Sequence, residues 1–279
     1  MNSWAHSLRR VAVVAGFTVA EAVRHRFFLL LAGAAGAFCI GALWLRELNL
    51  GGSADKFLLD AGFSAESVVG SVLAIATTAQ LFFAELERGT VVQILARPVR
   101  RAEYLAGRLT GIWLVLAGYC AGMTGLLLAL TWWSRAHPLA RAFSLALPDA
   151  GPTFNAGIAW CGWVIWLRLG VQAAMTLLVA SYARSSLFTM VAGFLLLMIC
   201  QLQHLGRGFL GATEALGARG MAELIGIVLP DYQLLDLADR TVAGEPWSGA
   251  VMGAIALYGL GYMGAFGCLA AWCFRHRDL

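Results

Sequence analysis

Residues 109–133 read LTGIWLVLAGYCAGMTGLLLALTWW, a continuous run without a charged side chain. A helix needs about 20 apolar residues to cross the hydrocarbon core of a bilayer, so this run is long enough to span a membrane. Five further apolar runs lie along the chain, at residues 27–45, 68–84, 159–182, 187–205 and 249–274. The sequence therefore predicts an all-α polytopic membrane protein with six transmembrane helices.

The composition of the whole chain supports this fold class. Of the 279 residues, 60% are hydrophobic and only 13% are charged, against about a quarter charged in a soluble domain. A soluble globular protein of this composition would have too few charged residues to cover its surface. A disordered chain would not carry 10 Trp and 15 Phe. The net charge of +4 is modest, and no nucleic-acid partner is predicted.

Cysteine and histidine side chains show no metal-binding pattern. The six cysteines lie inside or at the edges of apolar runs, without a CxxC motif, and the five histidines are far apart. Such cysteines are typical of small core residues. The sequence predicts neither a metal site nor a cofactor within this chain.

Arginine placement predicts the orientation. Most basic residues fall in the segments that six spans would leave on the same side as the N-terminus. Basic loops mark the cytoplasmic side of membrane proteins. We therefore expect a multi-pass protein of the bacterial inner membrane, with both termini in the cytoplasm.

The first 26 residues are predicted to form a helix lying in the membrane interface. Apolar residues recur there at helical spacing, at Leu8, Val11, Ala15, Val19 and Val23. The alternative is a cleaved signal peptide, since Arg9 and Arg10 precede an apolar stretch. It is disfavoured because charged residues, and not a small-residue cleavage site, follow this stretch.

Two connections between spans differ in length. Residues 183–186 form a very short inner turn, so the spans on either side should pack as an antiparallel hairpin. Residues 206–248 form a long outer loop. Its amphipathic stretch at 212–227, before Pro230, predicts one or two short re-entrant helices that dip into the outer leaflet.

Residues 85–108 read ELERGTVVQILARPVRRAEYLAGR and join the second and third spans on the predicted cytoplasmic side. Thr90 can cap a short helix through Ile94 and Leu95, which Pro98 ends. A second helix is expected to begin near Arg101 and to continue as the third span. An ordinary basic loop with a proline turn is the alternative interpretation.

This string resembles the cytoplasmic loop of ABC-2 type transporter permeases. The shared features, in order, are Glu85, Glu87, Gly89-Thr90, Ile94-Leu95, Pro98, Arg101, Tyr104-Leu105 and Gly107-Arg108. The helix over residues 1–26 looks like the elbow helix of that family, and the loop at 206–248 looks like its outer re-entrant helices. Within the family, the pattern is most similar to the branch that contains the nitrous-oxide-reductase maturation permease.

The resemblance implies that residues 1–279 form a single permease domain of an ATP-driven exporter. In this family two permease subunits, identical or homologous, pair in the lipid bilayer, and each docks a cytosolic ABC ATPase through a coupling helix. ATP and Mg²⁺ would be bound by that partner, because the only lysine of this chain, Lys56, is not in a P-loop motif. The chain is thus not expected to be an enzyme. The residues implied in the ATPase contact are Glu85, Glu87, Arg88, Gly89, Thr90, Ile94, Leu95, Arg97, Pro98, Arg101 and Tyr104.

Polar residues inside the spans leave other functions open. Arg168 lies within the fourth span, and intramembrane ionisable residues often mark transport pathways. Its expected polar neighbours are Gln172 of the same span and Thr77, Thr78 and Gln80 of the second span. A secondary transporter would use such groups for coupling, and a force-transmitting subunit without its own substrate is also open. An intramembrane enzyme is disfavoured because no span offers a nucleophile with a base.

Overall fold

The computed structural model describes residues 3–24, 26–45, 54–87, 101–136, 152–211, 226, 228–235 and 248–276. Within these ranges the chain forms helices joined by turns, and no strand is present among them. The helices are α1 (Ser3–Arg24), α2 (Arg26–Leu45), α3 (Ala54–Glu87), α5 (Arg101–Ala136), α7 (Pro152–Tyr182), α8 (Ser186–Gly211) and α11 (Gly249–Arg275).

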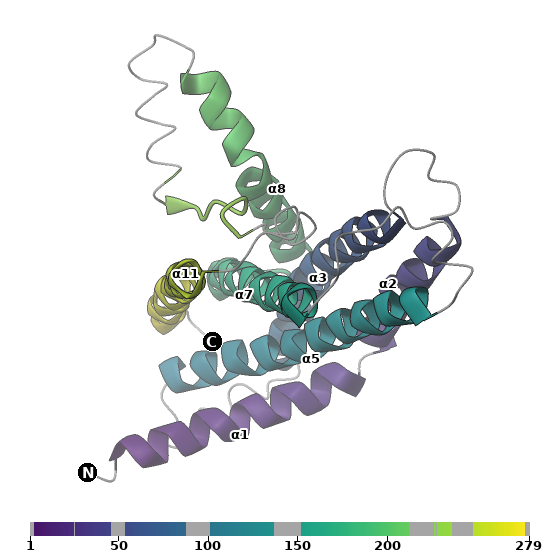
Figure 1. The fold of residues 1–279 in the computed structure, drawn as a ribbon. Helices are drawn as coiled ribbons and strands as arrows, with labels where there is room; N and C mark the ends of the chain where they lie inside the picture. Colours follow the sequence, from purple (N-terminus) through teal and green to yellow (C-terminus); the bar gives the residue numbers. More distant parts are fainter. Residues whose placement is uncertain are drawn as a thin grey trace.

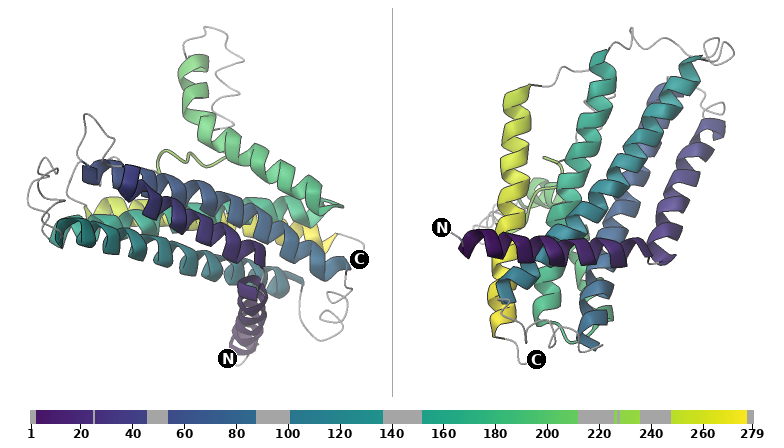
Figure 2. Two further views of the ribbon diagram at one scale, coloured as in Figure 1. Left: turned by 90° about the vertical axis from the view of Figure 1, so that its right-hand side faces the viewer. Right: turned by 90° about the horizontal axis from the view of Figure 1, so that it is seen from below.

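Six of these helices are long and apolar enough to cross a membrane, and they lie where the six spans are predicted. The predicted fold class is thereby confirmed. A helix, α1, also covers the N-terminal stretch for which an interfacial helix is predicted. Figure 2 shows that α1 crosses the other helices rather than running along them. Its position in a membrane interface stays a prediction.

The central helix of the bundle is α7. It packs against α3, α5, α8 and α11. In its most apolar stretch 89% of the span is buried, against 22% for α2 and for α11. Trp166 of α7 stacks on Trp113 of α5, with ring centroids 4.2 Å apart, and its indole N–H donates to the Trp113 carbonyl at 2.9 Å. Figure 1 shows α8 leaning away from this core. The outer helices thus leave most of their apolar surface free to face lipid.

The start of α3 differs from the sequence prediction. We expected the second span to begin at residue 68, because acidic residues precede it, but α3 begins at Ala54. The apolar residues Leu58, Leu59 and Phe63 are buried and extend the core-facing side of the helix toward its N-terminus. Glu66, which precedes the predicted second span, is fully buried in α3.

The loops agree with prediction where they are described. A turn over residues 183–185 joins α7 to α8, as predicted, and the two helices are in contact. The last helix begins at Gly249, as expected. In the stretch at 206–248, which is predicted to be an outer loop, α8 continues to Gly211 and residues 232–235 form a turn. The amphipathic stretch predicted to form re-entrant helices lies almost wholly outside the described residues.

Candidate functional site: a buried polar junction beside the predicted coupling segment

Arg108 is the largest fully buried side chain of the described residues. It lies on α5, two turns from the point where this helix follows the segment at 88–100. Its guanidinium group forms an ion pair with Glu85 at the end of α3, with Nη1 2.9 Å from Oε1. A buried arginine is costly unless it is paired and hydrogen-bonded, and this one is both.

Arg108 also binds the transverse helix α1. Its Nη1 donates to the Thr18 hydroxyl at 3.1 Å and lies 3.4 Å from Oε2 of Glu21. Its Nη2 donates to the backbone carbonyl of Leu81 in α3. One side chain therefore joins α1, α3 and α5. We call Thr18, Glu21, Glu85, Tyr104 and Arg108 the Arg108 junction.

Tyr104 completes the junction on the first turn of α5. Its hydroxyl donates to Oε2 of Glu85, and its ring stacks on Phe274 of α11 with centroids 6.2 Å apart. Arg101 lies one turn earlier and donates from Nη1 to the carbonyls of Phe274 and Arg275, at 3.2 and 3.0 Å. These carbonyls lie at the C-terminal end of α11, where a positive charge also interacts favourably with the helix dipole. The start of α5 is thus tied to the end of α11.

Close backbone approach holds α1 against α5. A Cβ atom on Gly107 would lie 2.7 Å from that of Val14, and one on Gly111 would lie 2.6 Å from that of Thr18. Larger residues at these two positions would push α1 away. Glu103 adds polar contacts at the other edge of this interface, accepting a hydrogen bond from Ser7 at 2.7 Å and pairing with Arg10 at 3.4 Å.

A second polar cluster surrounds Arg168 of α7. Its Nη2 donates to the side-chain oxygen of Gln201 in α8 at 2.8 Å, and its guanidinium carbon lies 4.8 Å from the centroid of the Tyr232 ring. The Tyr232 hydroxyl donates to Gln172 at 2.5 Å, and the Gln172 amide donates to the carbonyl of Gly193 at 3.1 Å.

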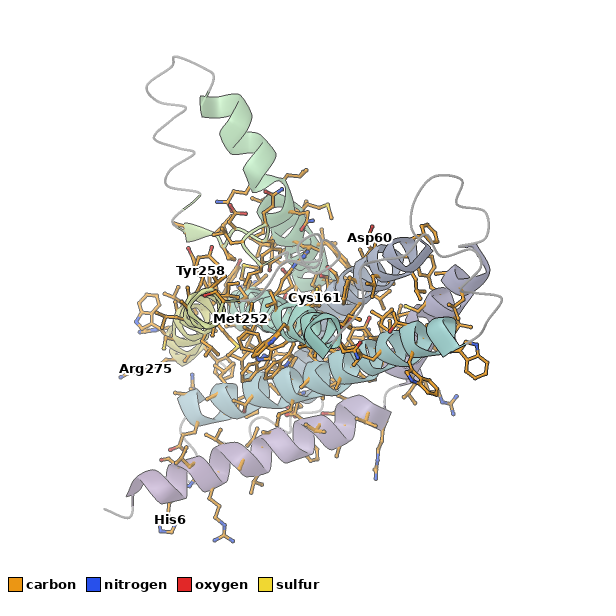
Figure 3. All side chains as sticks on the ribbon, viewed as in Figure 1. His6, Asp60, Cys161, Met252, Tyr258 and Arg275 are labelled. Carbon is orange, nitrogen blue, oxygen red and sulfur yellow. The ribbon has the colours of Figure 1, made fainter. Side chains whose placement is uncertain are left out.

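This cluster brings part of the chain between α8 and α11 into contact with the core. Tyr232 is buried although it lies outside the spans, and burial raises the pKa of its phenol well above the usual value. It therefore stays a hydrogen-bond donor at neutral pH. The neighbouring backbone N–H of Asp231 donates to the hydroxyl of Tyr258 in α11 at 2.8 Å, and Figure 3 shows Tyr258 on the side of α11 near this segment. The segment at 230–235 thus packs among α7, α8 and α11.

Comparison with known protein families decides the class of this bundle. The family model described as ABC-2 family transporter protein matches residues 45–279, which is most of the chain and contains five of the six spans. The chain belongs to the ABC-2 transporter family. The comparison with curated proteins gives no match.

The residues predicted to contact the ATPase of an ABC-2 transporter divide into two sets. Glu85, Glu87, Arg101 and Tyr104 are described, and three of them lie in or beside the Arg108 junction, whereas Glu87 is exposed at the end of α3. Glu85 and Tyr104 face the interior of this chain, which favours a positioning role for them. The other residues lie outside the described ones: Arg88, Gly89, Thr90, Ile94, Leu95, Arg97 and Pro98.

The predicted pathway residues all lie in the described helices α3 and α7. Arg168 and Gln172 are joined through Tyr232. Thr77 and Thr78 are buried in α3, where the Thr78 hydroxyl donates to the Ala74 carbonyl at 2.6 Å, and Gln80 is partly exposed. Gln201 and Tyr232, which contact Arg168, belong to α8 and to the 230–235 segment.

Sequence reasoning missed several residues that these clusters use. Thr18, Glu21 and Arg108 were not predicted as site residues, nor was Tyr232. Glu21 is the only acidic residue before the first span, which is a usable signal, since an acid in an otherwise basic interfacial helix needs a cationic partner. No comparable signal marks Tyr232.

We expect Arg168→Met to affect transport more than assembly. Methionine fits a buried helix position, so the protein should still reach the membrane, whereas Gln201 and Tyr232 would lose the cation that holds them together. Transport should fall severalfold in a vesicle assay at matched expression. The control is Arg184→Met, at an exposed arginine in the turn between α7 and α8. A normal rate for Arg168→Met would remove Arg168 from the transport pathway.

Proposed function

We propose that this chain is the permease subunit of an ATP-driven ABC-2 exporter, in which the segment at 85–108 receives force from a separate cytosolic ATPase. The observation that carries the proposal is the Arg108 junction. Within this segment, Glu85 lies just before residues 88–100, and Arg101, Tyr104 and Arg108 lie just after them. Both ends of the segment are therefore bound to the transmembrane helices through buried polar contacts.

The geometry suits the transmission of a movement. A push on the segment would act on α3 and α5 directly, on α1 through Thr18 and Glu21, and on α11 through the carbonyls bound to Arg101. Packed helices tend to move as rigid bodies between discrete states. ATP would favour one state through contacts that the ATPase makes only in that state. The Arg108 junction would convert these contacts into helix movement.

Two permease subunits would form the pathway, with the exposed apolar faces of α2, α8 and α11 available for lipid or for the second subunit. We infer the cytoplasmic termini, the inner-membrane location and the export direction from the arginine distribution and the family resemblance. The likeness to the branch of the nitrous-oxide-reductase maturation permease rests on the 85–108 motif alone. The cargo is not specified by these residues.

Co-purification from the native membrane tests the proposal. In mild detergent, a P-loop ATPase should accompany the wild-type protein in an amount comparable to the permease. Its absence at every detergent concentration that keeps the permease folded would favour a secondary transporter, in which buried ionisable groups such as Arg168 would carry the coupling.

Topology gives a second test. Single cysteines at Ser53 and Ala243, in a Cys-free background, should react with an impermeant maleimide from outside intact cells. A cysteine at Ala102, which is exposed at the start of α5, should react only after the cells are opened. Labelling of position 102 in intact cells would reverse the orientation and place the coupling segment on the wrong side for a cytosolic ATPase.

A further inference from the structure

Glu66 is an acidic residue buried within a membrane-spanning helix. Its residue exposure is 0%, and it lies in the α3 span at Phe57–Glu87. At 1.5 Å per residue, it is about 28 Å along α3 from Glu85 of the Arg108 junction. The two acids are thus separated by nearly the thickness of a hydrocarbon core, and the contacts described for the Arg108 junction do not involve Glu66.

The polar neighbours of Glu66 come from α5. The Thr124 hydroxyl donates to Oε1 of Glu66 at 3.2 Å, and the Tyr119 hydroxyl donates to the Glu66 backbone carbonyl at 3.2 Å. The other carboxyl oxygen, Oε2, is buried and has no hydrogen-bond partner. The Cys120 thiol of α5 is a second side-chain donor to the Glu66 carboxyl group. One hydroxyl and one weak thiol donor are far too little to solvate a carboxylate.

The titratable groups that face Glu66 are all neutral in their ordinary state at pH 7. They are the thiol of Cys39 from α2 and the side chains of Tyr119 and Cys120 from α5. On the α7 side, Gly162 packs against Thr124, since a Cβ atom there would lie 1.9 Å from the Thr124 hydroxyl oxygen. Among the described residues, no ion pair joins Glu66 to a cation.

Burial without a cation favours the uncharged form of a carboxyl group. We propose that Glu66 is a proton-binding site of the transmembrane bundle, which holds its proton while α3 packs against α5 and releases it when the two helices separate and water enters. The ligand is a single proton on the carboxyl group. This inference does not depend on the ATPase partner, because the site lies within one chain.

The vibrational spectrum of the purified protein tests the protonation state directly. In lipid nanodiscs at pH about 7, where an ordinary glutamate is ionised, the wild-type infrared spectrum minus that of Glu66→Gln should contain the C=O stretch of a protonated carboxylic acid. This band should shift to lower frequency in D₂O. If Glu66→Gln does not assemble, Thr124→Val replaces it, because loss of the hydroxyl should move the same band. Carboxylate bands at this pH, in place of the acid band, would overturn the proposal.

The pH dependence of thermal stability tests whether Glu66 releases its proton when α3 and α5 separate. If only the closed form binds the proton, raising the pH favours the open form. The equilibrium constant for opening then rises by up to tenfold for each pH unit. The wild-type melting temperature should therefore fall more steeply between pH about 6 and 8 than that of Glu66→Gln, which is neutral at every pH. Asp60→Asn, a change at a second acid of α3, is the matched control and should keep the wild-type slope. Parallel pH curves for wild type and Glu66→Gln would contradict linked proton release.

Discussion

Replacing Arg108 by leucine is expected to lower the free energy of unfolding by about 3–5 kcal/mol, the usual cost of removing one partner from a buried ion pair. The Glu85 carboxyl would be left at a side-chain exposure of 4% without the cation that binds it. Thr18 and the carbonyl of Leu81 would also lose their donor. Three helices would then lose a shared contact at once.

Thermal melting in nanodiscs and the yield of membrane-inserted protein measure this loss. Arg24→Leu is the matched control, because Arg24 is an exposed arginine of α1, and changes at exposed charges usually lie within about 0.5 kcal/mol. Adding Glu85→Leu to Arg108→Leu should recover part of the loss, since it removes the unpaired acid. A melting temperature of Arg108→Leu equal to that of Arg24→Leu would show that the junction does not hold the helices together.

Replacing both Ile94 and Leu95 by alanine is expected to weaken ATPase binding by about 2 kcal/mol or more, which is roughly 30-fold in affinity. These residues lie outside the described part of the chain, but they are the apolar centre of the predicted coupling helix. Central apolar anchors contribute most to an interface, whereas rim charges contribute less and respond to salt. The variant should release the ATPase or separate ATP hydrolysis from transport.

Pull-down and ATPase assays on the same membranes measure this effect, once equal expression has been verified. Arg100→Ala, a change at a neighbouring charge of the same loop, should alter little beyond the salt dependence. Because the double alanine variant leaves the Arg108 junction intact, its melting temperature should stay at the wild-type value. Full substrate-stimulated ATPase activity in the double variant would place the coupling contact elsewhere.

The two sets of variants separate two roles. Arg108→Leu should destabilise the permease by itself, whereas Ile94→Ala with Leu95→Ala should affect only its partnership with the ATPase. If both sets lowered the stability of the permease alike, the segment at 85–108 would be a structural loop. This is the alternative interpretation, a basic loop with a proline turn at Pro98.

The sequence by itself determined the number of spans, their places apart from the start of α3, and the start of the helix that carries the third span. Hydropathy is a local property, since a run such as 109–133 has to be buried in lipid whatever its neighbours are. The start of α5 at Arg101 follows equally from a local rule, because Pro98 cannot continue a helix. The family motif could be found for the same reason, as all of its residues lie within one short stretch.

Only the tertiary structure decided which polar residues share a site. Arg108 meets Glu21 across 87 positions of sequence, and Tyr232 meets Gln172 across 60, and no periodicity connects such pairs. Glu66 shows most clearly what could not be predicted from the sequence. Its charge suggested a loop, but the apolar residues before it continue the buried face of α3, and the free energy of burying that face outweighs the cost of enclosing one carboxyl group. Which side of a helix faces the core is decided by the packing of all its neighbours, so the partners of Arg108, Arg168 and Glu66 became visible only when the helices were assembled.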